Sequence, residues 1–295
     1  MARNISKLFA SIPKQRRRAF SLVELLVVMA IIGVLAAIGL PALKGIGGSN
    51  DIAAATRQLM DDLSFARIKA INERTTVYVV FVSDTILRQN WSNEEKIEVA
   101  KHANLQFTSY ALFTKRSLGD QPGFDRPRYL TDWRTLPEGI LIPTNKFDML
   151  KALSLTAREN ETLVNRPFFF GDEVAKVNLI PFPTASGKQI PLPYIAFDFQ
   201  GRLKQPANVA LMHDVIVPIS KGSVVYPQED KNLAANNLGF AEVIETPKGN
   251  YTNNPAIRID WLTGRARVVR PRLVTETTLS EQQYMDYADK GPKNL

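Results

Sequence analysis

The sequence contains no cysteine and only two histidines, His102 and His213. The absence of cysteine excludes disulfide bonds, thiolate metal sites and a cysteine nucleophile. The two histidines lie far apart in the chain, and we expect each to be a structural or surface residue. The catalytic patterns HExxH, GxSxG and GxGxxG and the P-loop are missing too. We therefore expect no enzyme activity, no metal ion or other cofactor, and no small-molecule substrate.

The first nineteen residues lack acidic side chains. None of the 29 aspartates and glutamates falls in this segment, whereas six of the 37 lysines and arginines do: Arg3, Lys7, Lys14, Arg16, Arg17 and Arg18. Much of the formal net charge of +8 thus belongs to this segment rather than to the rest of the chain. The overall charge alone is therefore weak support for nucleic acid as a partner.

Charged residues are also absent from residues 25–43. A helix needs about 20 apolar residues to cross roughly 30 Å of hydrocarbon, so the sequence predicts one membrane span over residues 20–43. Because lysine and arginine stay on the cytoplasmic side, we expect residues 1–19 in the cytoplasm and the chain after Lys44 outside. The pattern therefore predicts a single-pass membrane anchor with an external C-terminal domain.

Export signals are the alternatives to an anchor. A cleaved secretory signal has a shorter apolar core with a small-residue cleavage site after it, whereas residues 53–55, three alanines, lie well past this core. Residues 17–22, RRAFSL, resemble the twin-arginine pattern RRxFxL. The length of the apolar run and the presence of Glu24 favour the anchor.

Glu24 is an acidic residue at the start of an apolar segment. A charged side chain at the centre of a spanning helix costs about 2.5 to 3.5 kcal/mol on insertion scales, which makes it a functional candidate. The alternative is that Glu24 stays hydrated near the lipid headgroups, since it lies one helical turn from the cytoplasmic end.

Residues 19–26, AFSLVELL, resemble the processing motif of type IV prepilins and pseudopilins. In that motif a small residue precedes Phe, followed by Ser or Thr, Leu, any residue and Glu. The resemblance implies that a membrane prepilin peptidase cuts between Ala19 and Phe20 and methylates the new amino group of Phe20. The leader is longer than the short type, and Ala19 replaces the commoner glycine.

The same resemblance implies that Glu24 acts in assembly. Cleavage leaves an α-amine on Phe20, and such amines, with a reference pKa of about 7.7 to 8.0, are largely protonated at neutral pH. Glu24 of one subunit would pair with this amine of its neighbour, because an uncompensated carboxylate in a poorly hydrated place is costly. Pro41 is expected to kink the helix, and Gly33 and Gly39 to let neighbouring helices approach.

A second helical pattern is predicted over residues 44–74. Its apolar residues recur at steps of three and four, which indicates an amphipathic helix packed on a sheet: Ile52, Ala55, Leu59, Leu63, Ala66 and Ala70. Residues 44–50 read as loop-like, with Asp51 a candidate N-cap, and their glycines leave continuity with the first helix open. Arg57 and Asp61 are spaced for an i,i+4 ion pair.

Two pairs of adjacent acidic residues, Asp61/Asp62 and Glu94/Glu95, are expected to lie on solvated surfaces.

Two further segments are assigned from their local sequence. Residues 147–159 are a candidate helix, and the proline-rich residues 181–193 are a candidate loop.

Residues 75–295 are predicted to form a β-rich globular domain with insertions. β-branched and aromatic runs predict strands without alternating helices, which indicates an α+β fold with a long N-terminal helix packed on an antiparallel sheet. Thr263 and Gly264 are expected to form a tight turn. The expected strands are 75–82, 104–113, 138–142, 194–199, 209–217, 240–245 and 257–269.

Four blocks in this order resemble the GspH/FimT group of minor pseudopilins: residues 57–81, 133–140 (WRTLPEGI), 195–202 (IAFDFQGR) and 257–268 (IRIDWLTGRARV). The resemblance implies a pilin-like fold and a structural subunit of a type II secretion pseudopilus or a type IV pilus. Its partners would be other pilin or pseudopilin subunits, the prepilin peptidase and the inner membrane. Residues 85–130, 145–190 and 220–255 have no counterpart in the group and are candidates for specific partner contacts.

The alternative function is DNA binding. Residues 264–267, GRAR, followed by Arg270 and Arg272, resemble the GRxR element of DNA-binding FimT-like minor pilins. Clustered arginines would give salt-dependent, mainly sequence-independent affinity for phosphates. The competing interpretation is that Arg265 and Arg267 alternate with Ala266 and Val268 on an exposed edge strand, where basic residues discourage edge-to-edge pairing.

Overall fold

The protein is described here by a computed structural model. It describes residues 22–121, 124–154, 156–157, 161–172, 174, 178–204, 213–226 and 241–270, and for residues 35–49 the backbone alone. The chain divides into two units, residues 1–48 and 49–295, with the boundary inside the first helix.

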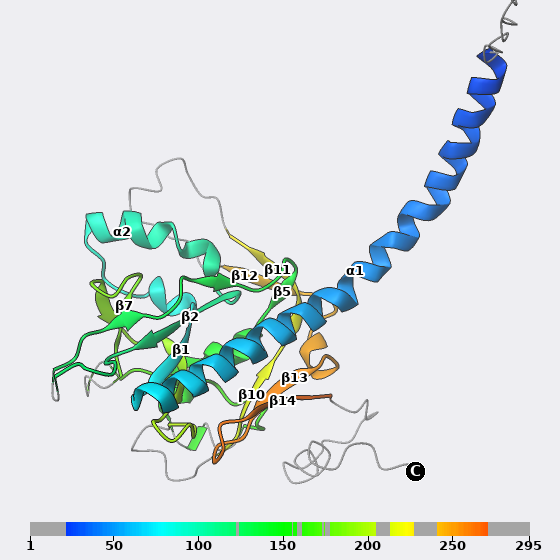
Figure 1. The fold of residues 1–295 in the computed structure, drawn as a ribbon. Coiled ribbons are helices and arrows are strands. Elements are labelled where there is room, and N and C mark those ends of the chain that lie inside the picture. Colours follow the sequence, from blue (N-terminus) through cyan, green and yellow to red (C-terminus); the bar gives the residue numbers. More distant parts are fainter. Residues whose placement is uncertain are drawn as a thin grey trace, which may run out of the picture. The chain divides into compact units, whose positions relative to one another are not determined.

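Helix α1 (Leu22–Glu73) is continuous over 52 residues (Figure 1). The loop-like interpretation of residues 44–50 is therefore wrong, as is the N-cap role of Asp51, which lies inside the helix. The glycines lower helix propensity here without ending the helix, because one glycine costs only about 1 kcal/mol relative to alanine.

The second half of α1 shows the predicted amphipathic pattern. Ala55, Leu59, Leu63, Ala66 and Ala70 are fully buried, and Ile52 packs against the same core. This confirms the apolar stripe.

The predicted Arg57–Asp61 ion pair is not formed, and both side chains are exposed. Among the described side chains of this helix, Lys69 and Glu73 do form an i,i+4 pair, with Nζ 2.7 Å from Oε1.

The largest sheet is antiparallel and centred on β1 (Val77–Phe81). Val79 lies opposite Leu112 of β2 (Ser109–Thr114) on one side and Ile195 of β9 (Pro193–Phe197) on the other. Successive side chains of a strand point to opposite faces, so the burial of every β1 residue means that both faces are covered. The other strands of this sheet are β3 (Arg128–Tyr129), β4 (Arg134–Thr135) and β6 (Phe169–Phe170).

Smaller antiparallel sheets make up the rest of the described strands. The strands are β5 (Ile140–Leu141), β7 (Ile180–Phe182), β8 (Lys188–Ile190), β10 (Val215–Pro218), β11 (Ser220–Val225), β12 (Glu242–Glu245), β13 (Ala256–Ile259) and β14 (Ala266–Val269). They form three sheets, with the strand orders β10-β13-β14, β12-β11-β5 and β7-β8.

Short helices interrupt the strands. Helix α2 (Asn93–Ala100) begins with a capping box, in which Ser92 and Glu95 bond to each other's backbone N–H groups. Helix α3 (Met149–Leu153) lies inside the predicted helix 147–159. The 3₁₀ turns are η1 (Asp84–Ile86), η2 (Ala103–Leu105), η3 (Thr144–Phe147) and η5 (Asn250–Thr252).

Two predictions of secondary structure after residue 75 are wrong. Residues 181–193 are not a loop: they contribute to the β7–β8 hairpin and the start of β9, because Phe182 and Ile190 bury their side chains despite the nearby prolines. Residues 104–108 are not strand, since η2 occupies their start and β2 begins only at Ser109. Residues 209–212 of another predicted strand lie outside the described residues.

The described chain is thus an α+β protein with an N-terminal helix and antiparallel sheets, which confirms the predicted class. Across the part of the chain that is described, no helix has the combined length and apolar character that crossing a membrane requires. The span predicted for residues 20–43 stays a prediction.

Candidate functional site

The processing site predicted at Ala19 and Phe20 lies outside the described residues. Within the described residues α1 runs from Leu22, so Glu24 lies in the first turn of the helix that is described. In the sequence, Glu24 comes four residues after Phe20, whose amine cleavage would create.

The first turns of α1 form an apolar surface around Glu24. Every side chain from residue 22 to residue 34 is exposed, and Leu22, Leu25 and Leu26 are 79%, 61% and 62% accessible. Monomeric soluble proteins rarely expose contiguous apolar surface of this extent. This surface is suited to contact with lipid or with other apolar helices.

Pro41 lies within α1, and the helix continues on both sides of it. Its side chain is not described, so the kink predicted there stays a prediction. Apart from the residues next to Gly33 and the nearby backbone of α1, no described atom lies within 4 Å of the position that a Cβ would take at Gly33. The approach of a neighbouring helix at Gly33 stays a prediction.

The second half of α1 is fixed to the large sheet by Asp62. Asp62 is 5% exposed, so the prediction that the Asp61/Asp62 doublet is solvated is wrong for this residue and holds for Asp61. Its Oδ2 accepts a hydrogen bond of 2.6 Å from the Tyr110 hydroxyl, and its Oδ1 accepts one from Arg134. Gln58, one turn earlier, donates to the Tyr110 hydroxyl and to the Thr135 carbonyl.

Arg67 connects α1 to two turns that follow β9 and β13. Its Nε donates to the carbonyl of Gly201 at 3.1 Å and to that of Thr263 at 2.7 Å. Gly264 has a φ of +63°, and a Cβ on it would lie 1.9 Å from the Gly201 carbonyl oxygen. The predicted turn at Thr263 and Gly264 is confirmed, and it has room only for glycine.

The arginines proposed for DNA binding lie at or beside an edge strand. β14 is the outer strand of its sheet, and Arg265, Arg267 and Arg270 are exposed. The expected alternation is only partly right, because Val268 is 43% exposed and Val269 is the buried residue. Arg272 lies outside the described residues.

Arg258, opposite Arg267 on the neighbouring strand, is not part of that exposed surface. Arg258 is 4% exposed, and its Nε lies 2.5 Å from Oδ2 of Asp214, itself 4% exposed. The other carboxylate oxygen of Asp214 accepts a bond of 2.8 Å from the backbone N–H of Trp261. The sequence offered no signal for this pair, because its members are 44 residues apart.

The two histidines lie far from one another in sequence and make local contacts. The ring of His102 packs edge-on against Phe182, and its Nδ1 lies 3.0 Å from the Glu98 carbonyl oxygen. His213 precedes Asp214 in the sequence and is half-buried. The contacts of His102 are those of a structural residue, as predicted.

Residues 14–40 match the family model described as the prokaryotic N-terminal methylation motif. This segment contains Ala19, Phe20 and Glu24, on which the resemblance to type IV prepilins rests, and that resemblance is thereby confirmed. Searches among curated proteins and among solved structures gave no match. The closer resemblance to the GspH/FimT group is carried by the sequence blocks alone.

Proposed function

We propose that the protein is a minor pseudopilin, a structural subunit of a type II secretion pseudopilus or a type IV pilus. The observation that carries the proposal is the matched N-terminal methylation motif, followed by an exposed apolar helix. The α+β domain after it, with a helix packed on an antiparallel sheet, is compatible with this role. Pilin-type proteins are structural, and the proposal includes no catalytic activity.

In this proposal residues 20–43 anchor the chain in the bacterial inner membrane before assembly, with residues 1–19 in the cytoplasm and the β-rich domain in the periplasm. The uncharged run of residues 25–43 and the basic leader support this orientation. The prepilin peptidase cuts between Ala19 and Phe20 and methylates the amine of Phe20. Removal of the leader takes away the cations that hold the N-terminus in the cytoplasm.

Glu24 then pairs with the Phe20 amine of a neighbouring subunit. Two opposite charges a few ångströms apart attract by about 4 kcal/mol at an effective dielectric constant of 20, so the pair favours one axial register over its neighbours. The exposed leucines around Glu24 pack against other subunit helices, and Gly33 allows a close approach.

Site-specific photo-cross-linking in the native host tests this assembly. Val28 lies one helical turn from Glu24 and is 46% exposed, so a benzoyl-phenylalanine placed there samples the neighbours of this surface. We expect cross-links to other proteins that begin with the same motif, identified by mass spectrometry. In the Glu24→Gln variant these cross-links should fall about tenfold, a loss of about 1.4 kcal/mol in association.

Asp61→Asn is the matched control, because Asp61 is an exposed acidic residue of the same helix. It should leave the cross-links unchanged. Cross-links to lipid alone, or a yield that is the same with and without the Glu24 carboxylate, would contradict the proposed assembly role.

A further inference from the structure

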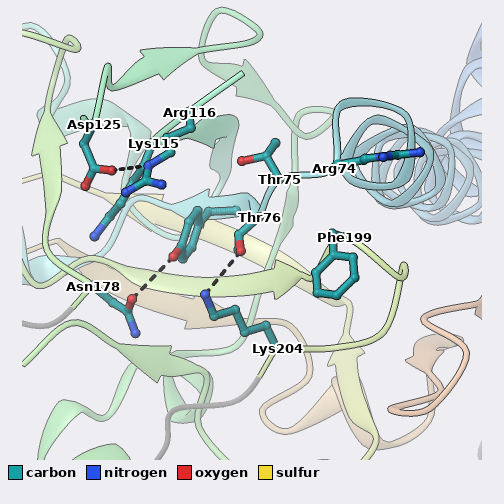
Figure 2. A pocket seen from close by; sticks show the side chains of 10 residues that line it. Arg74, Thr75, Thr76, Lys115, Arg116, Asp125, Asn178, Phe199 and Lys204 are labelled. Carbon is teal, nitrogen blue, oxygen red and sulfur yellow. Dashed lines mark hydrogen bonds and ion pairs between the residues drawn. The ribbon is translucent and has the colours of Figure 1, made fainter. Parts of the chain in front are cut away.

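A cavity of about 390 Å³ lies in the globular unit beside the point where α1 ends and β1 begins (Figure 2). Its walls come from the start of β1, the end of β2 and the segments that carry Asp125, Asn178 and Lys204. Residues far apart in the sequence therefore meet here, and none of them belongs to the N-terminal motif or to the arginines beside β14.

Basic side chains outnumber acidic ones in this cavity. Lys115, Arg116 and Lys204 line it together with a single carboxylate, Asp125. Arg116 and Asp125 neutralise each other, with Nε 2.7 Å from Oδ1. A fourth basic residue, Arg74, lines the rim, but its guanidinium points away from the other side chains in Figure 2.

Neither lysine has a carboxylate partner among the described residues. Lys204 Nζ donates to the Thr76 hydroxyl at 3.2 Å, and Lys115 is half-buried. Burial lowers the pKa of Lys115, Asp125 partly offsets this, and the like charge of Lys204 lowers it further. Lys204 itself is exposed, so it is the Lys115 ammonium that is both partly desolvated and repelled by a like charge. An anion bound in the cavity would relieve both effects.

Neutral hydrogen-bonding groups complete the lining. The Tyr78 hydroxyl donates to Asn178 Oδ1 over a long 3.4 Å, which leaves it able to turn toward a ligand. Burial raises the pKa of Tyr78 to about 12, so the hydroxyl keeps its proton at neutral pH and remains a donor. Thr76, whose hydroxyl accepts the bond from Lys204, adds a second hydroxyl to the lining (Figure 2).

We propose that this cavity binds a phosphate dianion, as inorganic phosphate or as the phosphate of a phosphomonoester. After the Arg116–Asp125 pair and Arg74, which points away, are set aside, two positive charges remain. A phosphate monoester carries about −1.5 to −2 at neutral pH. A carboxylate, with one negative charge, would leave one lysine uncompensated. Lysine is a common point-charge ligand for phosphate. The site lies outside the assembly surface, and it stands or falls independently of the proposed function.

Equilibrium dialysis of the full-length chain in neutral detergent, with radiolabelled inorganic phosphate as the probe, tests the site. We expect saturable binding of about one phosphate per chain, which acetate displaces only weakly. Lys115→Met and Lys204→Met should each weaken binding at least about tenfold, because each removes one of the two uncompensated charges. Lys221→Met is the matched control, since Lys221 is exposed and outside the cavity, and it should bind like the wild type.

Competition identifies the source of the phosphate. A short-chain phosphatidic acid that displaces the probe more strongly than glycerol 3-phosphate indicates a lipid headgroup, and equal displacement indicates a soluble ligand. Both outcomes support a phosphate site. Absence of saturable binding, displacement by acetate as strong as by phosphomonoesters, or unchanged binding in the Lys115→Met/Lys204→Met double variant would overturn it. Thermal unfolding of each variant verifies that it is folded. Neither substitution should destabilise the chain, because Lys115 is half-buried without a carboxylate partner among the described residues and Lys204 is exposed.

Discussion

The hydroxyl of Tyr110 donates a 2.6 Å hydrogen bond to the carboxylate of Asp62, joining the middle of α1 to β2. The bond crosses from the helix to the sheet, and Arg134 of β4 binds the same carboxylate from a second strand. Hydrogen bonds to charged groups are worth about 1.5 to 3 kcal/mol, more than bonds between neutral partners. Asp62 therefore fixes both the rotation and the axial position of the helix on the sheet.

Replacement of Asp62 by alanine should destabilise the globular unit by about 2 to 3 kcal/mol, since it leaves the Tyr110 hydroxyl without its acceptor and Arg134 without its counter-ion. Chemical denaturation of the full-length chain in detergent measures the change. Asp61→Ala, one residue away and exposed, should change the free energy of unfolding by less than about 0.5 kcal/mol. Equal effects of the two substitutions would contradict the role assigned to Asp62.

Alkaline pH should destabilise the fold through its buried tyrosines. Burial, with a smaller contribution from Asp125, raises the pKa of Tyr78 from 10.0 to about 12. Between these two values the unfolded chain has lost the tyrosine proton while the folded chain keeps it. Stability is therefore intact below about pH 10 and falls by about 1.4 kcal/mol per pH unit from there to about pH 12 for this group. Burial also raises the pKa values of Tyr110 and Tyr129, which adds to the loss.

Denaturant unfolding at about pH 9 and about pH 11, with tyrosinate absorbance followed in parallel, measures this dependence. Tyr78→Phe should reduce the slope of stability against pH by the contribution of one proton, whatever its effect on stability at neutral pH. An unchanged slope, or native tyrosines that all ionise near their usual pKa, would show that Tyr78 is not held in its neutral form.

The Asp214–Arg258 pair predicts a non-additive response to mutation. Asp214→Ala leaves the guanidinium of Arg258 buried without its counter-ion and should cost about 3 to 5 kcal/mol. The double variant Asp214→Leu/Arg258→Leu removes both charges and should recover a large part of that loss. A double variant as unstable as the sum of the two single ones would mean that the two charges do not interact.

The sequence predicts the helices and strands whose patterns are local. The stripe from Ala55 to Ala70 has helical spacing, and the β-branched run of β1 is long and apolar, so both are confirmed. The β7–β8 hairpin was missed because its prolines resemble those of a loop, and only burial of Phe182 and Ile190 against the rest of the core reveals strands. Such burial depends on residues distant in sequence.

The candidate sites also differ in whether a local sequence pattern reveals them. The N-terminal motif is contiguous and could be found from the sequence, whereas the cavity around Lys115 and Lys204 joins residues nearly ninety positions apart. Asp62 shows the limit most clearly: the sequence puts it beside exposed Asp61, and only the position of Tyr110 across the helix–sheet contact shows that one carboxylate is buried.

The exposed arginines at β14 allow a direct test of the DNA-binding alternative. Arg265 and Arg267 flank Ala266 at the start of an edge strand, a place where basic side chains also oppose strand pairing between molecules. We expect Arg265→Ala/Arg267→Ala to leave any weak, non-specific DNA binding unchanged in titrations at two salt concentrations. A marked loss of affinity, with a shallower dependence on salt, would instead support phosphate contacts by these arginines.

The N-terminal processing step is measured by intact-protein and peptide mass spectrometry of the chain extracted from membranes of host cells with and without their prepilin peptidase. We expect a chain that begins at N-methylated Phe20 when the peptidase is present and a chain with its leader intact when it is absent. A leader that persists in both strains, or a cleavage near residues 53–55, would contradict pseudopilin maturation and leave a plain membrane anchor or an exported domain in its place.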